Sequence, residues 1–233
     1  MTESQVVFNI LSRIKPYLSD DTDVSYRDVA FEIANQRALL IRNELNKGRT
    51  IDSDLIQDLG CVEVQPADPA ECCEVSTGCK VMRTVKKIPT TIELHNSDAI
   101  TRIGPVNKTL KAFSKTTFDG AKWVGNGKYT KDEIWAYRYN NYVYLVSNND
   151  KHKFIDMINV AGVLENPEDA AEFTNCANGG GACFSSEDEY PIKTWMYTYI
   201  VGNVIKMFVQ KYNLPADILN DNQDNTATKD QEN

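Results

Sequence analysis

The chain has 233 residues, of which 42% are hydrophobic and 25% are charged, and its formal net charge is −8. This composition is typical of a globular protein that can bury a sizeable core, and it excludes a disordered chain or a disulfide-dense scaffold. No apolar run reaches the ~20 residues that span a bilayer, and the start of the chain lacks the flanks of a signal peptide, so we expect a cytosolic product with no membrane partner.

The start of the chain predicts two helices. Thr2 and Gln5 have the spacing of a capping box, and apolar residues then repeat at helical spacing. A second helix is expected to follow Ser25 as its N-cap and to end at Gly48, with one buried face. Residues 1–56 are therefore predicted to form an N-terminal helical part.

Residues 57–165 are predicted to be a β-rich region. Short runs of β-branched and aromatic residues alternate there with Pro, Gly, Asn and Asp. The clearest element is a hairpin in "EIWAYRYNNYVYLVSN", because Asn140 and Asn141 tolerate the positive φ of a two-residue turn. Other expected strands lie at residues 61–65, 80–85, 90–94, 99–104, 121–125 and 157–164.

The remainder predicts a loop, a helix and a tail. Residues 166–190 combine three consecutive glycines with a run of acids, which indicates a mobile acidic loop with a short helix after Pro167. Residues 191–213 are apolar nearly all round and predict a core helix buried on more than one side. Residues 214–233 predict a polar, flexible tail. The expected fold class is α+β: a helical bundle formed by the N-terminal helices and the C-terminal helix, with a β-rich region inserted between them.

The six cysteines include four within residues 61–79. Structural zinc sites use cysteine pairs two to four residues apart, whereas two of these cysteines are adjacent, and cytosolic thiols stay reduced. We expect buried or incidental thiols and no cofactor, and we keep a cysteine–metal protein as a less favoured alternative. Its candidate ligands are Cys72, Cys73, Cys79, Cys176 and Cys183.

Catalytic motifs are missing from the sequence. Neither His95 nor His152 lies near a recognisable partner motif, and the glycine runs lack the lysine of a phosphate-binding loop. We expect no catalytic residue and no enzyme.

The charge of the chain is divided between two segments. Residues 80–131 hold eleven Lys or Arg against three acids, whereas residues 154–192 hold eight acids and no Lys or Arg. This pattern suits a nucleic-acid-binding module on residues 80–131, neutralisation within one chain, or head-to-tail contacts between identical subunits of a ring, which we favour. The candidate interface residues are Lys108, Lys111, Lys115 and Lys122 on the basic side, and Glu165, Glu168, Asp169 and Glu172 on the acidic side.

The stretch "RALLIRNELNKGRTIDSDLIQDLGCVEV", followed by "ECC", resembles the neck-forming connector, or ring, proteins of tailed bacteriophages, particularly the crAss-like group. The resemblance covers Arg37 to Cys73, and it extends to the rest of the chain through the order of helices, β-rich region, C-terminal helix and polar tail. It implies a structural virion protein, made in the cytoplasm of the bacterial host, that forms a ring of usually twelve copies.

The resemblance also implies partners. The ring would join the phage portal protein at the capsid vertex to the adjacent neck or tail ring protein. Genomic DNA would pass through its lumen without sequence-specific binding, and an acidic wall would repel phosphate and let the DNA slide. The tail, with Leu214, Ile218 and Leu219, would stay loose until it docks on the portal or a neighbouring ring.

Overall fold

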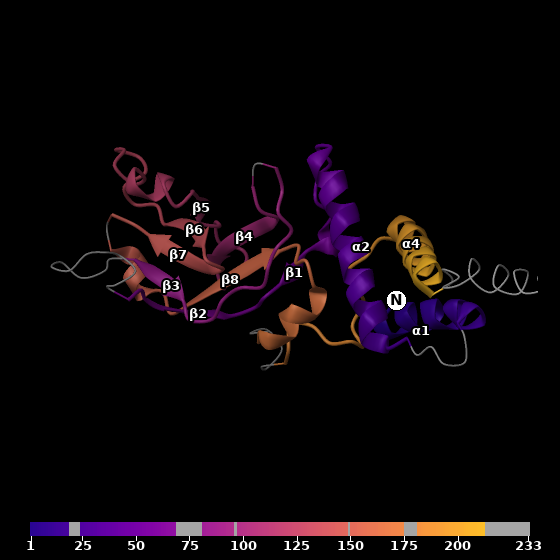
Figure 1. The fold of residues 1–233 in the computed structure, drawn as a ribbon. Coiled ribbons are helices and arrows are strands. Elements are labelled where there is room, and N and C mark those ends of the chain that lie inside the picture. Colours follow the sequence, from indigo (N-terminus) through magenta and orange to yellow (C-terminus); the bar gives the residue numbers. More distant parts are fainter. Residues whose placement is uncertain (19–23, 69–80, 96, 149, 175–180, 213–233) are drawn as a thin grey trace, which may run out of the picture.

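The chain folds into an elongated molecule, with a sheet at one end and helices at the other (Figure 1). The computed structural model describes residues 1–18, 24–68, 81–95, 97–148, 150–174 and 181–212. The content is α+β, as predicted. At the helical end, α1 (Glu3–Ile14), α2 (Tyr26–Asn46) and α4 (Thr194–Tyr212) contact one another.

The two N-terminal helices begin where their capping residues predict. The Thr2 side chain accepts a hydrogen bond from the Gln5 amide at 3.3 Å, and the Gln5 side chain accepts one from the Thr2 amide at 3.2 Å, which confirms the capping box. Ser25 Oγ accepts from the Asp28 amide at 3.1 Å and caps α2. Gly48, at φ 82°, follows the end of α2 and provides the left-handed conformation that terminates helices.

Helix α4 is less buried than its composition predicts. Its buried stripe consists of Met196, Ile200, Val201, Val204 and Phe208. Trp195 and Tyr199, in contrast, are 47% and 61% exposed. The prediction of burial on more than one side is wrong for a single copy of the chain, because α1 and α2 cover one side of α4 and leave its aromatic face open.

Within the described residues, the β part is a curled sheet of eight strands. Their order is β1-β8-β2-β3-β7-β6-β5, and β4 also pairs with β8. All pairs are antiparallel except the short β5–β6 pair. The strands are β1 (Gln57–Asp58), β2 (Val62–Pro66), β3 (Met82–Thr84), β4 (Ile100–Pro105), β5 (Ser114–Lys115), β6 (Trp135–Tyr139), β7 (Tyr142–Val146) and β8 (Met157–Gly162).

The predicted hairpin forms between β6 and β7. Tyr139 pairs with Tyr142, and the two turn residues Asn140 and Asn141 have φ of 49° and 63°. These positive values are those of the turn that matches the twist of the flanking strands. The hairpin prediction is confirmed.

Four further predicted strands also form, as β2, β3, β4 and β8, with their ends displaced by a few residues. Two others do not. Residues 90–94 contribute only isolated bridges, and Gly120–Lys122 forms a short 3-10 helix, η3. A β-branched composition does not specify a strand where no neighbouring strand edge is available for pairing.

The segment 166–190 packs against the helical end. Its described residues include a 3-10 helix, η5 (Pro167–Glu172), at the place where the short helix is predicted. Ala170, Phe173, Phe184 and Tyr190 of this segment belong to the main hydrophobic core. Residues 175–180, with most of the glycine run, lie outside the described residues.

A buried arginine joins the helical end to the sheet. Arg37 of α2 has 0% exposed surface, and its guanidinium donates from Nη1 to the Leu164 carbonyl at 2.7 Å and from Nε to the Pro191 carbonyl at 2.8 Å. Leu164 follows β8 and Pro191 precedes α4. Burial lowers the pKa of Arg37 to about 10, so the group still carries its charge at neutral pH. One side chain of α2 therefore fixes both the exit of the sheet and the entry of the last helix.

Candidate assembly surfaces

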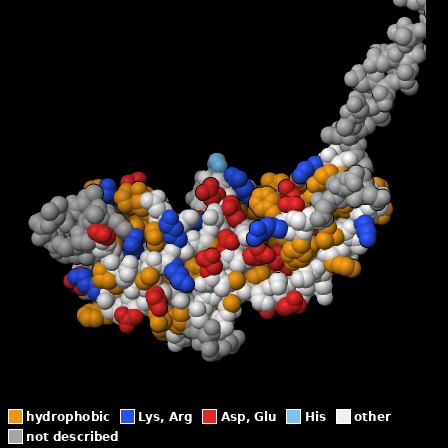
Figure 2. All heavy atoms as spheres, turned by 60° about the horizontal axis from the view of Figure 1, so that its bottom comes forward, with side chains coloured by type: hydrophobic (Ala, Val, Ile, Leu, Met, Phe, Trp, Pro, Cys, Tyr) orange, Lys and Arg blue, Asp and Glu red, His pale blue; other side chains and the backbone are white. Residues whose placement is uncertain are grey.

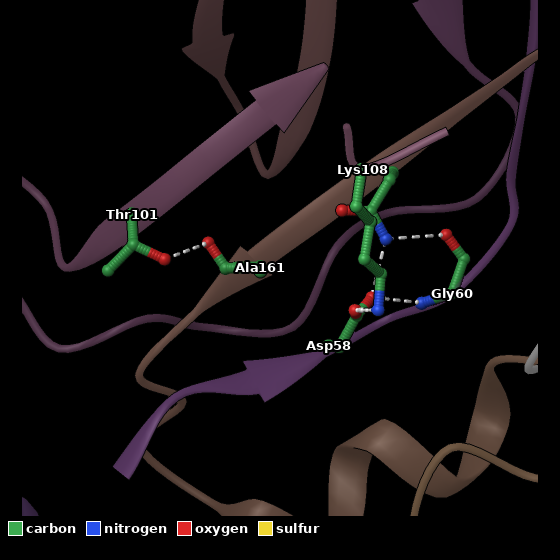
Figure 3. Close-up of polar contacts among 6 residues, drawn as sticks. Asp58, Gly60, Thr101, Lys108 and Ala161 are labelled. Atoms are coloured by element: carbon green, nitrogen blue, oxygen red, sulfur yellow. Dashed lines mark hydrogen bonds and ion pairs between the residues drawn. The ribbon is translucent and has the colours of Figure 1, made fainter. Parts of the chain in front are cut away.

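Lys108, a predicted basic-side residue, is neutralised within its own chain. Its ammonium pairs with the carboxylate of Asp58 at the edge of the sheet (Figure 3). The same carboxylate accepts hydrogen bonds from the Gly60 amide at 2.8 Å and from Asn159 Nδ2 at 2.5 Å, which hold β1 beside β8. Lys108 thus offsets the charge of a structural aspartate.

Two further predicted lysines are also engaged within the subunit. Lys111 Nζ lies 2.9 Å from Glu133 Oε1, and Lys115 Nζ donates a hydrogen bond to the Ile100 carbonyl. Burial lowers the pKa of Lys115. For Lys108 and Lys111 the structure therefore favours neutralisation within one chain, and Lys115 is held by a hydrogen bond inside its own subunit.

Lys122 differs from the other three lysines. It belongs to the β5–β6 loop, defined here as residues 116–134, and its Nζ lies 5.8 Å from the centre of the Phe118 ring. Lys128 of the same loop lies 5.7 Å from the Tyr129 ring. Neither lysine forms an ion pair with a carboxylate of the described residues, so both charges remain available.

The predicted acidic residues lie beside the helices. Glu165, Glu168 and Glu172 are exposed, whereas Asp169 is half-buried and accepts a hydrogen bond from Asn166 Nδ2 at 2.9 Å. Burial raises the pKa of Asp169. Glu165 and Glu168 are thus the most accessible acidic candidates next to α2.

Glu165 and Glu168 line a cleft of about 640 Å³ between α2 and the segment that leads into η5. Its other lining side chains come from the first turn of α1 and from the N-terminal half of α2. We call it the acidic cleft. Among its lining residues are Glu3, Tyr26, Arg27, Phe31, Glu165 and Glu168.

Large apolar side chains are exposed on all three helices. Phe8 of α1 is 73% exposed, Phe31 of α2 is 63% exposed and Tyr199 of α4 is 61% exposed. Figure 2 shows hydrophobic side chains gathered over this end of the molecule, with acidic side chains among them. Soluble monomers rarely expose large apolar patches, and such patches mark contacts with other proteins.

Comparisons with known proteins agree with a surface built for assembly. A family model described as phage tail ring protein 2 matches residues 5–226. The chain belongs to this ring protein family. It is also 24% identical to Ring protein 2 of Bacteroides phage crAss001 over 234 residues, which cover 99% of this chain and 98% of the relative. The resemblance to ring proteins of crAss-like phages is confirmed.

Family membership makes this ring protein a structural component of the phage tail that assembles as an oligomer, and it supports a structural and not a catalytic role. Of the two histidines, His152 is fully buried and His95 is exposed on a turn. Within the described part of the chain, no helix of the ring protein is long and apolar enough to cross a membrane.

Of the five cysteines named as candidate metal ligands, one lies in the described part of the ring protein. Cys72, Cys73, Cys79 and Cys176 lie outside the described residues. Cys183 is a free thiol whose pKa is raised to about 11 by burial. The residues that the structure describes contain no group of three His, Cys, Asp or Glu side chains that could hold a metal ion.

One cysteine differs from the expectation of reduced thiols. Cys61, next to β2 in the ring protein, is disulfide-bonded. The spacing of cysteines along a chain does not reveal which of them meet in space, so the sequence did not indicate this bond.

Two features of the ring protein were not recognised from the sequence. Glu3 is named in no prediction made from the sequence, yet its side chain is 2% exposed and lines the acidic cleft. Phe31 lies off the buried stripe of α2, and an apolar residue in that position was the available signal for a contact surface. The tail residues Leu214, Ile218 and Leu219 lie outside the described residues.

Replacing Glu3 with glutamine is expected to stabilise the ring protein at high pH. Burial and the neighbouring Glu168 raise the pKa of Glu3 from 4.5 to about 7. The folded state therefore holds its proton more tightly than the unfolded state, and stability falls as the pH rises from 4.5 through 7. In urea unfolding, the free energy of unfolding of Glu3→Gln should equal that of the parent near pH 4.5 and should be roughly 2 kcal/mol higher than that of the parent at pH 8.

The control for this experiment is Glu187→Gln, which removes an exposed acid close to the same helices. Its effect on the free energy of unfolding should stay within about 0.5 kcal/mol. A Glu3→Gln variant whose advantage does not grow with pH would contradict the assignment.

Proposed function

We propose that this ring protein forms a closed ring of twelve copies in the phage neck, where it joins the capsid portal to the tail and surrounds the channel for genomic DNA. The observation that carries the proposal is the match of nearly the whole chain, residues 5–226, to a tail ring family. The open aromatic surface of the three helices supports it, because a single copy leaves that surface exposed to water. Ring formation would cover it.

The three contacting helices would act as a bundle at one end of each subunit, with the sheet as a second layer at the other. A heterologous contact between different surfaces of identical copies closes into a ring when the rotation between neighbours divides a full turn. The net charge of −8 suits a channel wall, because negative charge repels the phosphates of the passing DNA.

The tail would provide the contact with the next ring or the portal. Residues 214–233 carry few apolar groups, and their large aliphatic side chains are Leu214, Ile218 and Leu219. We propose that these three side chains dock on the adjacent protein. A segment that orders only on docking would let ring formation precede attachment.

A nucleic-acid-binding module remains the second candidate, because the β5–β6 loop presents Lys122, Lys128 and exposed aromatic rings. It is less favoured because Lys108 and Lys111 form ion pairs with carboxylates of the same chain. Such a module would bind duplex DNA with an affinity that falls steeply with salt.

Electron microscopy of the purified chain, alone and mixed with the portal protein of the same phage, tests the proposed function. We expect closed twelvefold rings that sit coaxially on the portal. A chain that ends at residue 213 should still form rings but should lose the attachment to the portal or to the next ring. A protein that stays monomeric under both conditions would overturn the proposal.

A further inference from the structure

The β5–β6 loop exposes two large aromatic side chains. Trp123 is 77% exposed and Tyr129 is 88% exposed. The loop is nevertheless anchored, because Phe118 stacks on Tyr139 of β6 with 4.7 Å between ring centres. Burying large rigid rings costs little conformational entropy, which is why exposed Trp and Tyr act as anchors in protein interfaces.

The charges of the loop are also available. The loop balances three lysines, Lys122, Lys128 and Lys131, with three acids, Asp119, Asp132 and Glu133, but Glu133 pairs with Lys111 outside the loop. The same loop therefore presents both aromatic rings and unpaired ammonium groups.

The acidic cleft has the complementary character. It combines the exposed carboxylates of Glu165 and Glu168 and the buried carboxyl group of Glu3 with the rings of Tyr26 and Phe31. Glu3 is 98% buried by neighbouring groups, since only 2% of it is exposed, and its Oε2 has no hydrogen-bond partner among the described residues.

The loop and the cleft lie far apart on one copy. The loop follows β5 on the side of the sheet remote from the helices, whereas the cleft lies where α1, α2 and η5 meet (Figure 1). A subunit cannot fill its own cleft with its own loop. Two complementary surfaces at opposite ends are what a head-to-tail contact requires.

We propose that the β5–β6 loop of one copy inserts into the acidic cleft of the next copy and so forms the repeating contact of the ring. Trp123 and Tyr129 would pack against Phe31 and Tyr26, while Lys122 and Lys128 would meet Glu165 and Glu168. This inference rests on the proposed ring and adds the residues that close it. It replaces Lys108, Lys111 and Lys115 as interface candidates with the lysines whose charges are unpaired.

The cleft fits a second copy better than it fits other occupants. Its volume of about 640 Å³ is in the range that encloses an aromatic side chain with its neighbours. Its exposed carboxylates, Glu165 and Glu168, outnumber its one guanidinium, Arg27, and this disfavours the phosphates of nucleic acid. The lysines of the loop carry the opposite charge to the carboxylates of the cleft. Because both surfaces belong to the same chain, every copy brings one loop for each cleft.

Mixing two charge-reversed proteins tests the contact. One full-length variant carries Lys122→Glu with Lys128→Glu in the loop, and the other carries Glu165→Lys with Glu168→Lys in the cleft. Each variant alone faces like charges at every contact, so its assembly should weaken by on the order of 100-fold. An equimolar mixture restores opposite charges at every contact of an alternating ring, and a twelvefold ring accommodates that alternation.

Sedimentation and electron microscopy, with and without portal, measure the outcome against the parent chain. Lys86→Glu with Lys87→Glu is the matched control, because those two lysines also lie exposed over aromatic rings, at 5.9 Å each, but neither belongs to the loop or lines the acidic cleft. The control should assemble like the parent, and thermal unfolding should show that every variant is folded.

The inference is overturned if the loop variant assembles normally, if the control fails equally, or if the mixture of folded variants does not recover rings. A loop variant that keeps its assembly but loses salt-sensitive binding to duplex DNA would assign the loop to nucleic acid instead. The proposed ring survives all of these results, provided that the parent chain still forms rings. It fails only if the parent forms none.

Discussion

Replacing Arg37 with alanine is expected to lower the free energy of unfolding by about 4 kcal/mol. The substitution leaves the buried carbonyls of Leu164 and Pro191 without their donors, since Arg37 bonds them at 2.7 and 2.8 Å, and it opens a cavity at a fully buried position. The exit of the sheet and the start of α4 would both lose their fixed position. Urea unfolding followed by circular dichroism measures the loss.

Arg42→Ala is the matched control, because Arg42 lies on the same helix but is exposed. Its effect should stay within about 0.5 kcal/mol. Arg37→Lys should recover only part of the stability, since an ammonium lacks the planar fork that reaches two carbonyls. If Arg37→Ala cost less than about 1 kcal/mol, the role of this side chain as the tie between helices and sheet would be wrong.

Replacing Gly162 with valine is expected to cost about 3 kcal/mol. A Cβ on Gly162 would lie 2.9 Å from the Ala99 carbonyl oxygen and 3.0 Å from the Ile100 Cα, both of which are backbone atoms. Gly162 ends β8 and is paired on both sides, with Gln57 of β1 and Ile100 of β4, so neither neighbour can move without losing its register. Chemical denaturation of the purified variant gives the value directly.

Gly202→Ala provides the contrast within the same chain. Gly202 lies inside α4 and has open space around its missing Cβ. Alanine there should raise stability by about 1 kcal/mol through its higher helix propensity. Equal responses at Gly162 and Gly202 would contradict the argument from close backbone approach.

The local elements of this protein were predictable from its sequence. The caps at Thr2 and Ser25 and the turn at Asn140 and Asn141 use only side chains and backbone groups a few residues apart. Such signals act before any tertiary contact forms, so composition and spacing are sufficient to find them. The order of helices, β-rich region and last helix follows from them.

The surfaces that we propose for assembly include some of the residues that the sequence suggested. Charge segregation along the chain pointed to Lys122, Glu165 and Glu168, which do lie on the loop and the cleft. It also pointed to Lys108 and Lys111, which are paired within the subunit. A count of charges along a chain carries no information about which of them meet in the fold.

By itself, the sequence determined the α+β content, the helix starts, the β6–β7 hairpin and the ring protein family. Only the tertiary structure decided that Arg37 is buried between distant carbonyls, that Lys108 neutralises Asp58, and that one face of α4 stays open. The physical reason is the range of the interactions: caps and turns bond within a few residues, whereas burial and ion pairing depend on neighbours up to 188 positions away.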